Sequence, residues 1–395
     1  MTVLNLFRDR ERRYLLLSGS LTFLVLGLSQ AMYGPFYPHF REIYSLSASA
    51  TGMIASFHFA GATVAVAISG VAAGRFGFRP VITAGGLLFT GGFLGVALSG
   101  VWTGILFSAL LLGFGFGTLV VYNLFVDDYF GRLGPAALNL INMFFGIGSI
   151  LSPILAGVSM SLGDHRLGFL VGGALAMTAF VLSLRLPRRT PPQETDQSRA
   201  GVAMMGTGTF LLLFVLYIGA ESTSSNWIPT SLARLHPAAV VASVTSLFWL
   251  ALSAGRLVAM PLSIRITPPV MVIGAGSLSA ATALIARIDP LAIPAYILTG
   301  FFLGPFFPAA ISWIRRSFPT RAARITPLVL AGGGIGGIVF PPLVGTTVDR
   351  FGVPIIPVAL GAILILGMTT ALVIARYFPD RVGTMSSVRY TEGET

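Results

Sequence analysis

Polar side chains interrupt several long apolar stretches of this sequence, and their types suit the binding of a small polar solute. Tyr217 and Glu221 are four residues apart, and Gln30 and Tyr33 are three apart. In a helix each of these pairs shares one face. Phenol, amide and carboxyl groups all hydrogen-bond to hydroxyl groups, and a carboxyl can also take up and release a proton. The set predicts a solute-binding site in which Glu221 couples binding to proton movement.

Aromatic rings and further polar groups extend this candidate site. Trp227 and Trp249 can stack on the C–H face of a sugar while polar side chains bind its hydroxyls. His58 either lines the cavity or makes a hydrogen bond between packed helices. The complete set of predicted substrate-binding residues is Gln30, Tyr33, His58, Tyr217, Glu221, Asn226, Trp227 and Trp249.

Residues that typify catalytic, metal or nucleotide sites are missing from the sequence. The absence of Cys excludes disulfides, thiolate metal sites and cysteine nucleophiles. All 25 basic residues are Arg, so no Lys can complete a phosphate-binding loop, which excludes an ATP-driven pump. The four His are scattered, with no carboxylates at metal-ligand spacing. We therefore expect no enzyme activity, no catalytic residues, no metal and no cofactor.

The composition places the chain in a membrane. It is 54% hydrophobic and only 10% charged, with a mean hydropathy of +0.84, whereas soluble domains carry about 25% charged residues. The net charge of +11 does not indicate nucleic-acid binding, because the Arg residues fall in short loops and form no long basic face. Membrane lipid is the expected surrounding.

Twelve stretches of about 20 mostly apolar residues are long enough to span a bilayer. The predicted spans are 14–40, 49–73, 80–99, 104–128, 136–160, 167–186, 204–232, 238–262, 270–286, 291–313, 326–347 and 354–375. The first is too long in its apolar core to be a cleavable signal peptide. An even number of spans places both termini on one side of the membrane.

The Arg distribution predicts which side that is. Nineteen Arg fall in the ends and loops that share a side with the N-terminus, five fall in the loops of the other side, and Arg256 lies within a span. Since loops rich in Arg stay in the cytoplasm, both termini should be cytoplasmic, in the inner (plasma) membrane.

An internal repeat divides the chain into halves. Residues 146–157 and 334–345 are identical at seven of twelve positions, at an offset of 188. A repeat of half the chain in an apolar sequence is typical of transporters built from two related bundles, whose binding site lies between the halves. We expect a first bundle at 1–186, a cytoplasmic linker at 187–203, a second bundle at 204–376 and a cytoplasmic tail at 377–395.

This organisation resembles the major facilitator superfamily over the whole chain. The loop Gly70-Val-Ala-Ala-Gly74-Arg75-Phe76-Gly77-Phe-Arg79 looks like the signature loop of that superfamily, but it has Gly74 where an Asp is usual. Either Asp127 or Asp128 substitutes for this Asp, or both only mark a solvated helix end. The stretch 345–352 fits the signature better by letter, but it follows span eleven on the other side and receives no signature role. The resemblance implies an all-α membrane protein of twelve transmembrane helices in two pseudo-symmetric six-helix bundles.

A narrower resemblance links the second half to the fucose–galactose–glucose proton symporter group. It rests on Tyr217 to Glu221 with Trp227, and on Phe248-Trp249 with Gly255-Arg256. The resemblance implies uptake of a sugar or similar polyol. The carboxylates that carry protons in spans one and four of that group have no counterpart here, where Gln30 and Asn123 stand at comparable depth.

Arg256 is predicted to form a gate. It lies roughly 9 Å to the cytoplasmic side of the centre of its span, at a depth similar to that of Asn139 and Asn142. We expect Arg256 to donate to these amides when the cytoplasmic side is shut; the alternative is that it extends to the lipid headgroups. On the same scale Arg256 stands about 12 Å from Glu221 along the membrane normal, too far for a close pair.

These observations predict a secondary active transporter that works by alternating access. The favoured substrate is a sugar or similar small polar solute, taken up with a coupling proton or sodium ion by a monomeric protein. An exporter of amphipathic or drug-like compounds in the same fold is the first alternative, supported by the 30 Phe residues. A non-transporting membrane sensor is an alternative from another class.

Overall fold

The computed structural model describes residues 6–190, 204–318 and 321–378, and within them every regular element is a helix. The first group of helices comprises α1 (Arg10–Gln30), α2 (Tyr33–Ile43), α3 (Ala48–Phe76), α4 (Phe78–Leu98), α5 (Trp102–Leu119), α6 (Tyr122–Phe130), α7 (Gly134–Ser161) and α8 (Arg166–Ser183). The second comprises α9 (Met204–Ala233), α10 (Ala238–Leu262), α11 (Pro268–Ile285), α12 (Ala292–Leu303), α13 (Phe306–Ser317), α14 (Ala322–Phe351) and α15 (Ile356–Tyr377). Short 3₁₀ turns lie at Gly131–Leu133, Asp289–Leu291 and Val353–Ile355. Most of the predicted linker and tail lies outside the described residues.

The helices are long and apolar enough for twelve membrane crossings. Ten segments qualify singly, and α1 with α2 forms one further crossing bent by 45°. One of the ten, Trp102–Ser161, is 60 residues long, about 90 Å of helix against a hydrocarbon core of about 30 Å. It turns at Gly131, whose φ is +52°, and therefore makes two crossings. The fold class predicted from the sequence is confirmed.

Three of the crossings are broken into two helices each. The breaks fall at Ala31–Met32, at Val120–Val121 and at Gly304–Pro305. The second and third occupy corresponding crossings of the two groups. Broken helices free backbone polar groups, which a membrane tolerates only where protein or a water-filled cavity surrounds them. The breaks therefore indicate the interior of the molecule as the place of the functional site.

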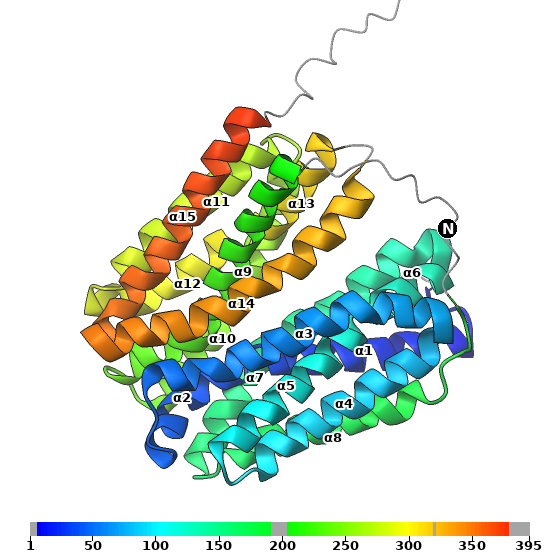
Figure 1. Cartoon of the computed structure of the whole chain (residues 1–395), viewed down its shortest axis with the longest axis horizontal. Coiled ribbons are helices and arrows are strands. Elements are labelled where there is room, and N and C mark those ends of the chain that lie inside the picture. The colour runs from blue at the N-terminus through cyan, green and yellow to red at the C-terminus, as the bar shows by residue number, and fades with distance from the viewer. Residues whose placement is uncertain (1–5, 191–203, 319–320, 379–395) are drawn as a thin grey trace, which may run out of the picture.

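The two groups form separate bundles (Figure 1) that contact each other mainly along two helix pairs, with a further contact between α2 and α9. Helix α3 packs along α14, and α7 packs along α10. Helices α4, α8, α11 and α15 make their main contacts within their own group and lie on the outside, where lipid surrounds them. The predicted spans that correspond to these four helices contain no ionisable residue, amide, Trp or Tyr in their interiors.

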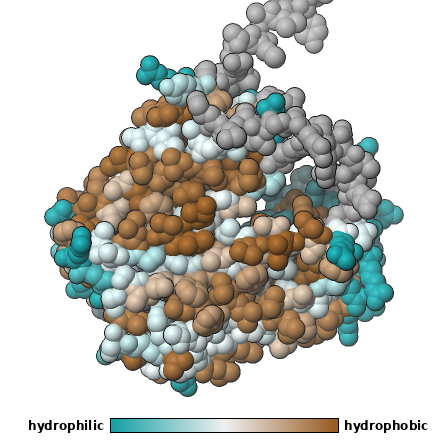
Figure 2. All heavy atoms as spheres, in the orientation of Figure 1, coloured by the Kyte–Doolittle hydropathy of each residue, from teal (hydrophilic) through white to brown (hydrophobic). Residues whose placement is uncertain are grey.

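The bundles meet on one side of the molecule and diverge on the other. We call the side on which α1 begins and α15 ends the terminus side, and the other the opposite side. On the α3–α14 seam, contacts run from the opposite side as far as Thr63 and Gly334. Beyond them, Ala67 and Gly70 on the same stripe of α3 are exposed. Figure 2 shows the face hollowed between the bundles toward the terminus side.

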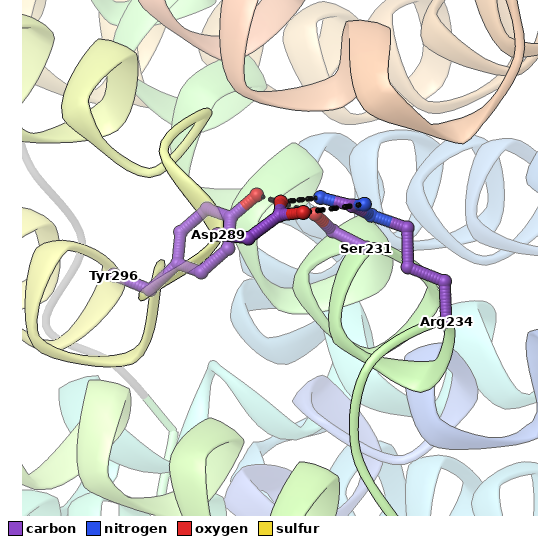
Figure 3. Close-up of polar contacts among 4 residues, drawn as sticks. All are labelled: Ser231, Arg234, Asp289 and Tyr296. Carbon is purple, nitrogen blue, oxygen red and sulfur yellow. Dashed lines mark hydrogen bonds and ion pairs between the residues drawn. The ribbon is translucent and has the colours of Figure 1, made fainter. Parts of the chain in front are cut away.

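The opposite side of the second bundle is fastened by polar contacts (Figure 3). Arg234, just after α9, pairs with Asp289 before α12 through both guanidinium nitrogens. The Tyr296 hydroxyl donates to Ser231 Oγ at 2.7 Å. These bonds join the ends of two crossings and keep this end of the bundle rigid.

Candidate functional site

Tyr217 joins the two deepest charged groups of the second bundle. Its ring is 3% exposed and stacks on Phe306 with centroids 5.0 Å apart and planes at 14°. Arg256 Nη2 of α10 donates to the Tyr217 hydroxyl at 3.5 Å, and the same hydroxyl interacts with the Glu221 carboxyl one turn further along α9. A cation, a phenol and a carboxyl therefore form one cluster.

Arg256 and Glu221 form no close pair, in keeping with the expectation from their separation along the membrane normal, but Tyr217 lies between them. Arg256 also interacts electrostatically with Glu221. The depth of a residue along a helix axis ignores the length of an Arg side chain, which here extends to Tyr217. No direct ion pair joins Arg256 and Glu221 among the described residues, so the Tyr217 hydroxyl is the link between them.

Tyr33 and His58 form the corresponding polar pair of the first bundle. The Tyr33 hydroxyl lies 3.2 Å from His58 Nδ1, and both residues are almost completely buried. His58 therefore makes the hydrogen bond between packed helices that was one of its two predicted roles. Its Nε2 is buried without a hydrogen-bond partner, which is costly unless a solute supplies one.

The break between α1 and α2 changes the prediction for Gln30. Gln30 is the last residue of α1 and Tyr33 the first of α2, and the two helices meet at 45°. The expectation that these residues share one helix face is therefore wrong, because no continuous helix connects them. Gln30 is half-buried at the break, where it remains a candidate for solute binding.

Close helix contacts place the polar pairs of the two bundles at the same level. A Cβ on Gly336 of α14 would collide with a backbone carbonyl of α9 two residues before Tyr217. The next residue, Gly337, lies against Phe59 of α3, which follows His58. Glycine allows this approach because it has no side chain. His58 and Tyr217 are thus at one depth, on helices that both pack against α14.

Trp227 and Asn226 lie in the contact between the bundles on the opposite side. Trp227 is fully buried, donates from Nε1 to the Pro341 carbonyl at 3.0 Å and packs edge-on against Tyr37, with centroids 5.1 Å apart. Asn226 Nδ2 donates to the Ser222 carbonyl of its own helix at 2.8 Å. In this conformation both side chains have protein partners and are separated from the polar cluster.

Trp249 of α10 differs from Trp227 in having an unused donor. It is 3% exposed, packs beside Phe248, and its Nε1 has no hydrogen-bond partner. It lies seven residues before Arg256 on the same helix, which is two turns. A buried indole N–H without a partner suits a residue that contacts a solute.

The predicted gate residues lie on the open terminus side. Asn139 and Asn142 of α7 are exposed, and Asn142 Nδ2 donates to Asn123 Oδ1 at 3.1 Å. Arg256 is directed to Tyr217 instead. The contact between Arg256 and these amides was predicted for the form closed on this side, so it stays a prediction.

A cavity of about 450 Å³ leads from Arg256 to the terminus side. It runs between α10, α11 and α13, and its polar lining includes Ser263, Ser312 and Arg316. Arg256 is therefore reachable by a polar solute from that side even though its side chain is largely covered.

Two groups of residues were missed by the sequence analysis. Phe306 and Phe307 enclose the Tyr217 ring, and the Gly304-Pro305 pair that breaks the helix was the signal for them. Asp349 on α14 accepts from the backbone N–H groups of Ala48 and Ser49 on α3, at 2.7 and 2.9 Å. It belongs to the signature-like stretch that received no role, and it ties the two bundles on the opposite side.

Comparison with known proteins agrees with the geometry. The family model described as Major Facilitator Superfamily matches residues 19–231 and again 200–394. The chain is 25% identical over 337 residues to a probable nitrate/nitrite transporter, NarK2, of Mycobacterium tuberculosis, covering 80% of this chain and 84% of the relative. It is 21% identical over 355 residues to the glucose/mannose transporter GlcP of Bacillus subtilis, covering 85% and 88%. A bacterial homologue of the lysosomal transporter Spinster, solved in an inward-facing form, superposes with a TM-score of 0.80 at 14% identity, covering 94% and 98%.

Proposed function

This chain belongs to the Major Facilitator Superfamily, and from that premise we propose that it takes up a sugar or similar small polar solute together with a proton. It is a membrane transporter and not an enzyme. The solute binds between the bundles, which alternate in opening to the two sides. Like its relatives, it moves a small molecule; the solute and the coupling ion are the proposed part.

The cluster of Tyr217, Glu221 and Arg256 is the observation that carries this proposal. It combines hydrogen-bond donors, acceptors and one exchangeable proton at the level where the bundles part. The phenol, guanidinium and carboxyl groups can each hydrogen-bond to the hydroxyls of a polyol. The unpaired Nε1 of Trp249 and Nε2 of His58 provide further groups for solute hydroxyls.

Solute binding is coupled to the proton because Glu221 and Arg256 share Tyr217 as a partner. When Glu221 is ionised, its attraction for Arg256 holds the Tyr217 hydroxyl between them. Protonation of Glu221 removes that attraction and frees Tyr217 and Arg256 to bind solute hydroxyls. Solute affinity thus depends on the proton, which links the two fluxes.

The terminus side is proposed to face the cytoplasm. The excess of Arg in the ends and loops of that side supports this orientation, as does the polar stretch at 187–203 that joins the bundles there. The described conformation is then open to the cytoplasm. A reporter active only outside the cytoplasm and fused after Arg199 should stay silent; strong activity would overturn the orientation.

Glu221→Gln in proteoliposomes tests the coupling. The amide mimics the protonated carboxyl, so the variant should still exchange labelled sugar but lose accumulation driven by a proton gradient. Glu42→Gln, which removes an exposed carboxyl at the end of α2, is the matched control and should accumulate like the wild type. If Glu221→Gln still accumulates sugar against its gradient, another group carries the proton. If uptake by the wild type depends on a sodium gradient instead, sodium and not the proton is the coupling ion.

A small anion is the second candidate substrate. Arg256 Nε is buried without a hydrogen-bond partner, Arg316 lines the cavity that reaches it, and NarK2 is a relative. With Glu221 protonated, the cluster carries a net positive charge. Uptake of labelled nitrate that Arg256→Gln abolishes, with no uptake across a sugar panel, would favour the anion; export of apolar amines would favour the drug-exporter alternative.

A further inference from the structure

A large cavity lined by described residues lies outside the transport path. It has a volume of about 1100 Å³ and opens between α4, α6 and α8 at the terminus side of the first bundle. Helices α4 and α8 are the two lipid-facing helices of the first bundle. The cavity is therefore open to the membrane and not to the space between the bundles.

The end of this cavity nearest the terminus side is basic. Arg79, Arg188 and Arg189 line it, against the single carboxylate of Asp128. Asp128 Oδ2 pairs with Arg189 Nη1 at 3.7 Å. No ion pair with a carboxylate of the described residues is found for Arg79 or Arg188, so the described lining of the cavity has an excess of positive charge.

The backbone around the basic end is held in place. The Phe78 N–H at the start of α4 donates to the Arg189 carbonyl at 2.8 Å. Gly77 just before it has φ +86°, and a Cβ there would stand 3.0 Å from the same carbonyl. The Arg189 guanidinium also lies over the Tyr129 ring, 4.6 Å from its centroid. The segment that follows α8 is thereby fixed to α4 and α6.

The rest of the cavity is apolar and runs along the membrane normal. Thr83, Ala84 and Leu87 of α4 line one wall, and Phe180 and Leu184 of α8 line the other. Leu87 lies nine residues beyond the start of α4, which is about 13 Å of helix. The cavity therefore extends from the headgroup level into the hydrocarbon region.

We propose that this cavity binds an anionic phospholipid of the surrounding bilayer. The phosphate lies between Arg79 and Arg188, and one acyl chain follows the groove between α4 and α8. Charge complementarity supports this occupant, since a zwitterionic lipid would not offset the excess of positive charge. The apolar walls favour a lipid over a soluble phosphate, which would leave them in contact with water. A bound lipid would hold the segment 188–190 against the first bundle.

Native mass spectrometry of the delipidated full chain, titrated with phosphatidylglycerol and with phosphatidylcholine, tests the proposal. The wild type should prefer phosphatidylglycerol. Arg79→Gln/Arg188→Gln should lose that preference by on the order of tenfold, while Arg132→Gln/Arg376→Gln, which removes two exposed Arg outside the cavity, should keep it. A preference for phosphatidylglycerol that is unchanged from the wild type in Arg79→Gln/Arg188→Gln would overturn the site.

A groove variant distinguishes a lipid from a free anion. Ala84→Trp fills the apolar part without altering charge, so it should weaken phosphatidylglycerol binding while leaving any binding of inorganic phosphate unchanged. If inorganic phosphate competes with the lipid at millimolar concentration and Ala84→Trp has no effect on lipid binding, the ligand of the cavity is a soluble anion and not a lipid. Either result is independent of substrate uptake, because none of these residues belongs to the polar cluster between the bundles.

Discussion

The C-terminal ends of α3 and α14 carry segments that are identical at four of eight positions, and only the second segment ties the bundles together. Residues 70–77 read Gly-Val-Ala-Ala-Gly-Arg-Phe-Gly, and residues 345–352 read Gly-Thr-Thr-Val-Asp-Arg-Phe-Gly. The final glycines share one backbone conformation, with φ/ψ of 86°/164° at Gly77 and 77°/174° at Gly352. The segments differ at the second to fifth positions, and the fifth is Gly74 on the terminus side and Asp349 on the opposite side.

The fifth position contributes to holding the opposite side closed. Asp349 accepts two N–H groups at the first turn of α3, where the helix dipole also favours a negative charge. Gly74 has no side chain, and no atom lies within 4 Å of the position its Cβ would take. The same backbone geometry therefore ties the bundles together only where a carboxylate is present. We call the contacts of Asp349 with Ala48 and Ser49 the latch.

Closing the opposite side should be most sensitive to the tight glycine contacts beside that latch. A Cβ at Gly345 would meet the Ala48 carbonyl oxygen and Ser49 Cα at 2.6 Å, so Gly345→Val should keep the bundles apart there. We expect uptake to fall more than tenfold. Gly274→Val on lipid-facing α11, where nothing lies within 4 Å, should transport normally; a Gly345→Val protein with normal uptake would show that this contact does not limit closure.

Removing the charge of Asp349 should have the next largest effect. Asp349→Asn loses one acceptor and the attraction to the helix dipole, together about 1–2 kcal/mol. The population open on the opposite side should rise by on the order of tenfold. The measurement is labelling of a thiol introduced as Ser56→Cys on the seam, in this chain without Cys. Asp164→Asn removes a carboxylate charge beside the start of α8, within the first bundle only, and should not change labelling.

Adding the missing carboxylate should shift the balance in the other direction, by less. Gly74→Asp meets no steric obstacle in the described conformation, but the new side chain stands near the C-terminus of α3, where a negative charge is disfavoured. We expect labelling of Ala67→Cys on the terminus side to fall a few-fold. The exchange Gly74→Asp/Asp349→Gly should invert the preference of the wild type. Unchanged labelling in both variants would mean that the carboxylate is not what separates the two ends.

The smallest effect concerns pH and is confined to the opposite side. Burial, together with the neighbouring His39 at 3.0 Å, lowers the pKa of His165. A His with a lowered pKa in the folded state favours folding in its neutral form, so stability falls as the pH drops below about 6.5. The Tm should decrease slightly between pH 7.5 and 5.5.

His165→Gln should flatten this dependence, and His236→Gln should not. Seam labelling should be the same at both pH values, since the His39–His165 pair lies within the first bundle. A pH-dependent change in labelling would show that the His39–His165 pair affects the latch. It would weaken the conclusion that Asp349 is what distinguishes the opposite side from the terminus side.

Much of the architecture could be predicted because its physical signals are local. The apolar runs predict the twelve crossings, since a bilayer demands a minimum length of helix. Tyr217 and Glu221 share a face as predicted because α9 is continuous through them. Gln30 and Tyr33 do not, because the helix breaks between them. Pro35 was the signal for this break, since its ring is incompatible with a helical carbonyl at Ala31, four residues before it. The contact of Arg256 with Tyr217 was missed because it depends on side-chain reach between two helices.

By itself the sequence determined that this protein lives in lipid, that it consists of two related halves, and which few polar groups lie deep within them. These follow from composition, periodicity and repeat, which each segment carries independently of its neighbours. Only the tertiary structure decided that Asp349 closes one side while its counterpart Gly74 leaves the other free. The sequence alone also could not show that the Tyr217 phenol joins Glu221 and Arg256. Both depend on which helices meet and at what level, and that is a property of packing between segments some 40 to 300 residues apart.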